Sequence, residues 1–275
     1  GTLKCNNQCH FNTSLCRINR CGEGNTYLGN NSCSAKIEAY YKDTNIYGIG
    51  GVSGGNRWRD LRSLSSGTFI DQTINYGFLT IQAGLISSGD GGGLMLSRTY
   101  IPFNTSSLPE LARVSSASLS LIKFPYWYSN SDPNSFDFIS LISTTPENPP
   151  ETILDDFDQF GDLDNPLELA NKVDMSETEN SSSTIFNFNR EGLKKINKKG
   201  YTNLGLRSGF DIKNHEPKFH RDQDADSTSA FSYYFYPGNY SSEGRGPYLT
   251  INYSIPEINY LHQRNLEMGE SSRRT

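Results

Sequence analysis

The chain has 275 residues, of which 35% are hydrophobic and 12% aromatic, and its formal net charge is −5. This length predicts one large domain, or one domain with a small one beside it. The acidic balance and the lack of a Lys/Arg stripe argue against a nucleic-acid partner, and no apolar run approaches the ~20 residues that span a membrane, so we expect no membrane insertion.

The first element along the chain is a cysteine-rich segment, residues 1–34. It is polar and too short for a hydrophobic core, so we expect disulfide bonds to hold it together. The spacing C-x3-C-x6-C-x4-C-x11-C lacks the C-x2-C pairs of zinc modules, which favours disulfides over zinc. Five cysteines leave one thiol over, to pair upstream of the first residue or with another chain. They are Cys5, Cys9, Cys16, Cys21 and Cys33.

Residues 35–254 contain short runs in which apolar and polar residues alternate, the pattern of half-buried β-strands. In VSSASLSLI, Ala117, Leu119 and Leu121 alternate with serines. In SFDFISLIS both faces are apolar, which predicts a more fully buried strand. The runs AFSYYFYPG and PYLTINYS also alternate. Further strands are expected at 36–41, 67–72, 78–83, 94–103, 185–188 and 203–208.

Turn signals such as SSGDGGG and PGNYSSEGRG separate these runs. Ten or so strands without a βαβ rhythm predict an all-β fold, a jelly-roll-like antiparallel β-sandwich. One short helix is expected in NREGLKKINKKG, with Asn189 as its N-cap and Gly200 just after its end. Residues 255–275 are expected to form a tail or linker. The predicted units are therefore 1–34, 35–254 and 255–275.

Three segments follow one another in a recognisable order: RTYIPFNTSSLPELARVSSASLSLI at 98–122, NREGLKKINKKGYTNLGLRSGFD at 189–211 and GPYLTINY at 246–253. In this order they resemble the DNRLRE-type (disaggregatase-related) β-sandwich domains of large secreted bacterial and archaeal proteins. The first segment matches the family's arginine, its F-[DN]-x-S-x-[IL]-P turn with one extra residue, and its SAxLxLY strand. The matching residues are Arg98, Phe103, Asn104, Ser106, Leu108, Pro109, Ala117, Leu119 and Leu121.

The resemblance covers roughly residues 36–254. It implies a jelly-roll-like sandwich similar to carbohydrate-binding modules, of a kind that occurs beside polysaccharide lyases and in adhesin-like surface proteins. The stretches GTLKCNNQCHFNTSLC and CGEGNTYLGNNSC resemble short Cys-rich repeats of archaeal and bacterial surface proteins. Such repeats are normally disulfide-linked spacers.

Six N-x-[ST] sequons occur in the chain. Together with the dense cysteines they favour a secreted protein, extracellular or at the cell surface, that carries glycans. The acceptor residues are Asn12, Asn30, Asn104, Asn180, Asn239 and Asn252.

We expect no catalytic activity from this chain. Its histidines are His10, His215, His220 and His262. None lies near a nucleophile-elbow pattern such as G-x-S-x-G, and no H-E-x-x-H motif occurs.

No cofactor is expected, apart from a structural calcium ion. The segment DIKNHEPKFHRDQDADS carries Asp222, Asp224 and Asp226, whose carboxylates could bind Ca²⁺. The simpler interpretation is a solvated loop between two strands. The acidic loop LDDFDQFGDLDNP at 154–166 lacks the ligand order of an EF-hand.

The aromatic run FPYWYSN is the best candidate for recognition. Phe124, Tyr126, Trp127 and Tyr128 follow a strand, and Tyr234, Tyr236 and Tyr240 could join the same surface. Flat rings with a polar tip suit the apolar faces of sugars. The alternative is that these rings pack over the edge of the sandwich, or that the surface receives another subunit.

The sequence therefore predicts a non-catalytic extracellular module that attaches to polysaccharide or to a neighbouring surface, within a larger surface protein. One alternative is a structural subunit of an extracellular filament, sheath or fibre, a homopolymer joined through strand edges. The other is an accessory carbohydrate-binding domain of a polysaccharide-degrading enzyme.

Overall fold

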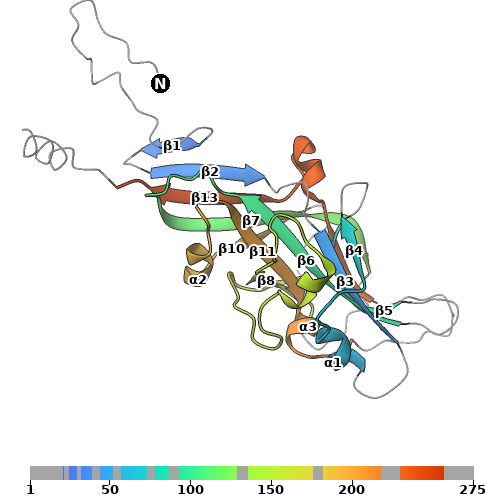
Figure 1. Ribbon diagram of the computed structural model, residues 1–275. Helices are drawn as coiled ribbons and strands as arrows, with labels where there is room; N and C mark the ends of the chain where they lie inside the picture. The colour runs from blue at the N-terminus through green and yellow to red at the C-terminus, as the bar shows by residue number, and fades with distance from the viewer. Residues whose placement is uncertain are drawn as a thin grey trace, which may run out of the picture.

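The computed structural model describes residues 21, 25–29, 32–38, 44–51, 57–72, 78–86, 93–128, 136–175, 182–217 and 230–256. Within these ranges the chain forms a 13-stranded antiparallel network with a few short helices (Figure 1). The predicted all-β, sandwich-like fold is confirmed. The order of the strands determines which side chains lie together at the surface and which are buried in the core.

One part of the network has the order β1–β2–β13–β7, and β10 also pairs with β7. These strands are β1 (Thr26–Gly29), β2 (Ser32–Glu38), β13 (Tyr248–Ser254), β7 (Arg113–Tyr128) and β10 (Ser183–Asn187).

The other part continues from β7 in the order β12–β5–β6–β11–β8–β9, and β3 pairs with both β4 and β6. These strands are β12 (Ala230–Phe235), β5 (Leu79–Ile86), β6 (Gly93–Asn104), β11 (Tyr201–Ser208), β8 (Phe138–Ser143), β9 (Val173–Asp174), β3 (Thr44–Gly51) and β4 (Phe69–Gln72).

Strand β7 belongs to both parts. Its first ten residues pair with β13 and β10, and its last residues pair with β12. The predicted alternation is confirmed along it, since Ala117, Leu119 and Leu121 are buried in the core. On β13, Leu249, Ile251 and Tyr253 are buried in the same way. Burial of such side chains is the main favourable contribution to folding.

Most predicted strands are present, and β8 is buried on both faces as its two apolar faces predict. The sequence pattern does not predict β1, β3 or β9. Strand β3 has the sequence TNIYGIGG, whose glycines favour turns. It nevertheless pairs with β6 from Thr44 opposite Tyr100 to Gly51 opposite Gly93, so tertiary pairing overrides the local preference.

The helix predicted after Asn189 is confirmed but is shorter than predicted. Helix α2 (Arg190–Lys194) begins where the Asn189 side chain accepts a hydrogen bond from the Gly192 N–H at 2.9 Å. It ends at the C-cap Lys195, before the predicted Gly200. The structure also holds α1 (Arg57–Arg62), α3 (Gly209–Ile212) and the 3-10 helices η2 (Leu154–Asp158) and η3 (Gly238–Glu243).

The cysteine-rich segment is attached to the sheet by a disulfide between Cys21 and Cys33, whose Cα atoms are 5.5 Å apart. Both cysteines are buried, and Cys33 lies in β2 opposite Tyr253 of β13. The Tyr253 hydroxyl donates to the Cys21 carbonyl. The predicted boundary between residues 34 and 35 thus falls inside β2, a strand of the sandwich. Cys5, Cys9 and Cys16 lie outside the described residues.

We predict that replacing Cys21 and Cys33 by alanine lowers the free energy of unfolding by about 2–4 kcal/mol, because the unfolded chain regains the freedom of the closed loop. Urea unfolding of the double variant measures this. Disulfide mapping of the wild-type protein by mass spectrometry checks the pairing, and a bridge from Cys21 to any other cysteine would contradict the structure.

Candidate functional site

Five aromatic rings form a continuous surface cluster, here called the aromatic face. They come from the start of β5, from β7, from β12 and from the segment that follows β12. The ring centroids lie 4.1 Å apart for Phe78 and Phe124, 5.1 Å for Phe124 and Tyr236, and 5.3 Å for Tyr236 and Tyr240. Tyr234 lies 6.1 Å from Phe78. Tyr236 is buried and the other four rings are half-buried, so the cluster offers ring surface to solvent.

An irregularity in β7 places these rings together. Tyr233 of β12 pairs with Trp127 of β7, and Phe235 pairs with Lys123. Three residues of β7 therefore lie opposite the single residue Tyr234. One of the three is a proline, which cannot donate to the strand ladder. Bulges of this kind often redirect side chains beside functional sites.

Arg245 gives the aromatic face a cation at its rim. Its guanidinium carbon lies 5.3 Å from the Tyr236 ring centroid, and its Nη1 donates to the Tyr236 hydroxyl at 3.4 Å. A weak ion pair at 3.8 Å joins Arg245 to Glu243. The side chain of Arg245 is 52% exposed. The face thus combines apolar ring surface with tyrosine hydroxyls and a guanidinium that can donate hydrogen bonds.

The structure brings together four of the predicted recognition residues in this face, Phe124, Tyr234, Tyr236 and Tyr240. Tyr126, Trp127 and Tyr128 lie on β7 beside it, but their side chains are outside the described part of the chain. Phe78 was not among the residues predicted from the sequence. The signal that could have found it is the strand pairing, since Tyr234 pairs with Thr80, two residues further along β5.

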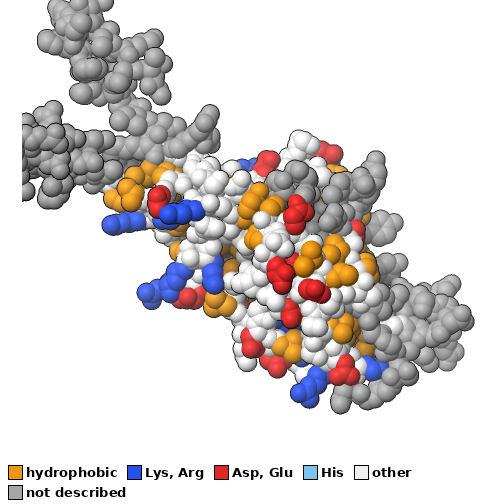
Figure 2. Space-filling view, viewed as in Figure 1, with side chains coloured by type: hydrophobic (Ala, Val, Ile, Leu, Met, Phe, Trp, Pro, Cys, Tyr) orange, Lys and Arg blue, Asp and Glu red, His pale blue; other side chains and the backbone are white. Residues whose placement is uncertain are grey.

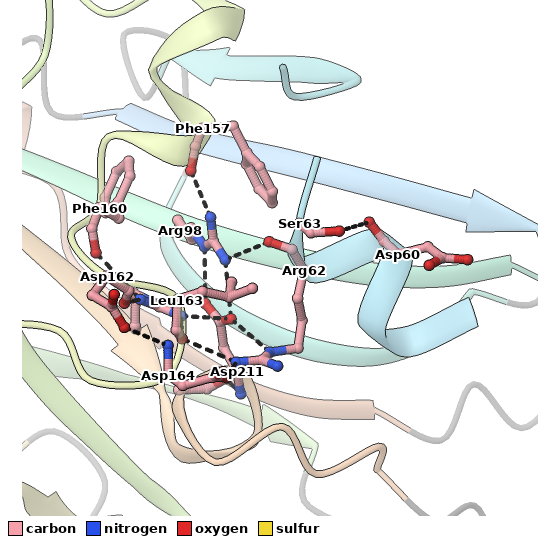
Figure 3. A network of polar contacts seen from close by, with 12 residues as sticks. Asp60, Arg62, Ser63, Arg98, Phe157, Phe160, Asp162, Leu163, Asp164 and Asp211 are labelled. Carbon is pink, nitrogen blue, oxygen red and sulfur yellow. Dashed lines mark hydrogen bonds and ion pairs between the residues drawn. The ribbon is translucent and has the colours of Figure 1, made fainter. Parts of the chain in front are cut away.

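A second cluster, the arginine network, lies inside the protein (Figure 3). The carboxylate of Asp211 accepts two hydrogen bonds from Arg98, at 2.9 and 3.0 Å, and two from Arg207, at 2.7 and 2.9 Å. Arg62 approaches the same carboxylate at 3.4 Å. All four residues are buried. Asp164, whose side chain is 61% exposed, accepts from Arg62 at 2.8 Å.

Most of the remaining donors of the network bind the backbone of the acidic loop, and Arg98 also donates to the Arg62 carbonyl at 2.9 Å. Arg98 donates to the carbonyl of Phe157 at 2.7 Å. Arg207 donates to the carbonyls of Asp162 and Leu163, both at 2.8 Å, and Arg62 also donates to Leu163, at 2.9 Å. Each guanidinium group offers five N–H donors in a fixed plane. The three arginines together can therefore hold the acidic loop in place although it has little regular structure.

The charges in the network shift the pKa values of its members. Burial alone would raise the pKa of Asp211, but Arg98 and Arg207 overcome this and hold that pKa well below its ordinary value. Burial lowers the pKa of Arg98, and the neighbouring Asp211 opposes that shift. Asp211 is therefore ionised at neutral pH. The network is the polar centre of the fold and has no exposed face of its own apart from Asp164.

Sequence reasoning did not single out this network. The available signal was Arg98, a charged residue within the otherwise buried strand β6. A buried charge requires a buried partner, so Arg98 indicated that an acidic side chain lies beside it. Arg98 lies in the first of the segments that carry the family resemblance, and Arg207 and Asp211 lie in the second. Their pairing joins two of the matched motifs in space.

The predicted calcium residues Asp222, Asp224 and Asp226 lie outside the described residues. Among the residues that are described, no group of three or more His, Cys, Asp or Glu side chains could hold a metal ion. In the acidic loop, Asp162 instead accepts hydrogen bonds from the backbone N–H groups of Asp164 and Asn165.

Three of the six predicted glycosylation sites are described. Asn104, at the end of β6, and Asn239, in η3, are exposed. Asn252, on β13, is half-buried and donates to the Ser116 hydroxyl at 3.0 Å. Asn12, Asn30 and Asn180 lie outside the described ranges. Glycosylation stays a prediction.

One stretch of the sequence, GVSGG at 51–55, fits the G-x-S-x-G pattern. It begins at the last residue of β3, and its other residues are outside the description. The flanking elements are an antiparallel strand and the six-residue helix α1. A nucleophile elbow also joins a strand to a helix, but it sits in an α/β-hydrolase sheet, whereas β3 pairs antiparallel with both β4 and β6 in an all-β fold. The absence of catalysis stays a prediction.

Comparison with known proteins adds no identification. No family model matches the chain, and no curated protein matches it. The resemblance to DNRLRE-type domains therefore stays a prediction. No helix in the described ranges is long and apolar enough to cross a membrane.

We predict that Asp211→Asn lowers the free energy of unfolding by about 3–5 kcal/mol, because it leaves three buried guanidinium groups without their carboxylate. The matched control is Asp60→Asn in α1, where the side chain is exposed and the change is expected to stay within about 0.5 kcal/mol. Urea unfolding curves of both variants measure the difference, and equal effects would contradict a central role for Asp211.

The depressed pKa of Asp211 also predicts a pH dependence. In the unfolded chain an aspartate titrates near a pKa of about 3.9, whereas in the folded protein the pKa is well below that value. The stabilisation from Asp211 is therefore complete above about pH 5 and is lost as the pH falls through 4 and below. The difference in urea midpoint between wild type and Asp211→Asn should shrink over this range. A difference that is constant down to pH 3 would contradict the assignment.

Proposed function

We propose that the protein is a non-catalytic extracellular module that attaches to polysaccharide through the aromatic face. The observation that carries this proposal is the cluster of five aromatic residues, four of them half-buried and Tyr236 buried, whose rings are held in contact beside the bulge in β7. They are Phe78, Phe124, Tyr234, Tyr236 and Tyr240.

The chemistry of the face suits a sugar chain. One side of a pyranose ring presents C–H groups, which pack against the flat rings and gain dispersion and hydrophobic free energy. Tyrosine hydroxyls and the exposed Arg245 guanidinium can bind the sugar hydroxyls at the edges. Since several rings lie in series, the face can contact more than one sugar unit. Attachment of this kind needs no catalytic group.

The extracellular location rests on three supports. The Cys21–Cys33 disulfide is compatible with an oxidising compartment. The six sequons and the cysteine-dense segment point the same way. An accessory domain of a polysaccharide-degrading enzyme would bind polysaccharide through the same aromatic face. That alternative differs from the proposed surface module only in the domain to which the chain is joined.

A structural subunit of a filament or sheath is the second candidate. The observation that favours it is β1, the last strand on its side of the described network. Two of its side chains, Tyr27 and Leu28, are 48% and 59% exposed. The backbone N–H and C=O groups of an edge strand can pair with a strand of another chain, and exposed apolar side chains beside them would add buried area to such a contact.

The attachment proposal predicts that Tyr234→Ala and Tyr240→Ala each weaken binding about two- to tenfold, the loss expected from one aromatic contact. Trp127→Ala tests the run in β7 in the same assay. Affinity electrophoresis in gels that contain neutral or acidic polysaccharides measures the effect.

The matched control for this assay is Tyr27→Ala, which removes an exposed tyrosine from β1, away from the aromatic face. It should bind as the wild type does. Wild-type protein that is retarded by no polysaccharide would overturn the proposal. Retardation that is unchanged in Tyr234→Ala, Tyr240→Ala and Trp127→Ala would show that the polysaccharide binds outside the aromatic face.

A further inference from the structure

The surface charges of the protein are segregated along the chain. Between Phe124 and Asn171 there is no lysine or arginine. The acidic residues of this stretch are concentrated from Glu147 to Glu168, and most of them are exposed. Residues 190–199 carry five basic residues and one acidic one. Such segregation gives one molecule two surface regions of opposite potential.

The first region, here called the acidic patch, consists of Ile153, Leu154, Asp155 and Asp158. Ile153 and Leu154 are 38% and 37% exposed, although both are large apolar side chains. The two aspartates beside them are exposed. The patch therefore has an apolar centre with negative charge around it, and not the uniform polarity of a solvated loop.

The acidic patch is held rigidly from below. The buried carboxylate of Asp156 accepts hydrogen bonds from the backbone N–H groups of Ile153 and Glu147, both at 2.9 Å. The Leu154 carbonyl accepts from the Gly67 N–H at 2.8 Å, and the arginine network holds the Phe157 carbonyl. A surface ordered before binding loses little conformational entropy when a partner covers it.

The second region, the basic patch, consists of Leu111, Arg190, Lys194, Lys195 and Lys199. Leu111 is 56% exposed. It lies beside the lysines because Lys198 Nζ donates to the carbonyls on either side of it, those of Glu110 and Ala112. Two of its lysines form ion pairs within the patch, Lys199 with Glu110 and Lys194 with Glu191, both at 2.6 Å. Basic side chains still outnumber acidic ones, so the patch has an exposed apolar side chain beside a net positive charge, the opposite sign to the acidic patch.

Both patches lie on one face of the molecule. Figure 2 shows Lys and Arg side chains gathered over α2, and Asp and Glu side chains with apolar neighbours gathered over the segment around η2. A second copy turned by 180° about an axis through this face would place each basic patch on the other copy's acidic patch. Both contacts would form at once, as a two-fold interface requires.

We infer that this face is a self-complementary interface that joins two copies of the chain in a two-fold dimer. The occupant of each patch is the oppositely charged patch of the second copy. The apolar centres supply the area removed from water, and the charges supply orientation and specificity. The inference is independent of the attachment proposal, because none of its residues belongs to the aromatic face.

The test uses two charge-reversed proteins. One carries Lys195→Glu with Lys199→Glu, and the other carries Asp155→Lys with Asp158→Lys; all four side chains are exposed. Lys36→Glu with Lys213→Glu, also exposed, is the control that repeats the first change in charge outside the patches. Sedimentation velocity at about 0.1 mM protein and about 50 mM salt measures association, and circular dichroism checks that each variant is folded.

We expect wild-type protein and the control to form dimers whose dissociation constant rises roughly tenfold or more at about 0.5 M salt. Each charge-reversed protein should dimerise at least roughly tenfold more weakly, because like charges then face one another. An equimolar mixture of the two should regain the dimer, since both contacts are again between opposite charges. Wild-type protein that stays monomeric or forms larger polymers would overturn the inference. So would a dimer that neither reversal weakens, or a mixture that stays monomeric.

Discussion

The fold depends on one buried carboxylate. Asp211 holds Arg98 and Arg207 in bidentate contact and also receives Arg62, so residues from α1, β6, β11 and α3 meet at a single point. Through their other donors the same arginines fix the backbone of the acidic loop. Buried charges are tolerated only when each is paired and hydrogen-bonded, and this requirement sets where α1, α3 and the loop lie on the sheet.

The two proposed surfaces have different structural origins. The aromatic face arises from an irregularity in strand pairing, where three residues of β7 oppose Tyr234. The acidic patch arises from the arginine network, which supports a loop of poor regular structure from beneath. One surface is apolar and suited to sugar faces, and the other is charged and suited to a second copy of the chain. No residue of the aromatic face belongs to either charged patch, so the two proposed contacts would use different side chains.

The period-two alternation of β7 and β13 was enough to predict their buried faces, and the N-cap chemistry of Asn189 was enough to place the start of α2. Glycine-rich β3 could not be predicted because its order comes from pairing with β6. Phe78 joins Tyr234 and Tyr236 through strand neighbours that are far apart in sequence. The arginine network could not be predicted for the same reason, since its members are brought together only by the tertiary fold.

The position of the disulfide has a mechanical consequence. The chain enters β2 at Ser32 and leaves β13 at Ser254, and these two residues are partners at the same end of the ladder. A load that pulls the chain apart at these two points would peel β2 from β13 one rung at a time, beginning there. Cys33 and Tyr253 form the next rung. There the Tyr253 hydroxyl also donates to the carbonyl of Cys21, which the disulfide joins to Cys33, so β13 holds the β2 side by a hydrogen bond in addition to the ladder. The rung next to the point where tension would first open the sheet thus carries one contact more than backbone pairing supplies.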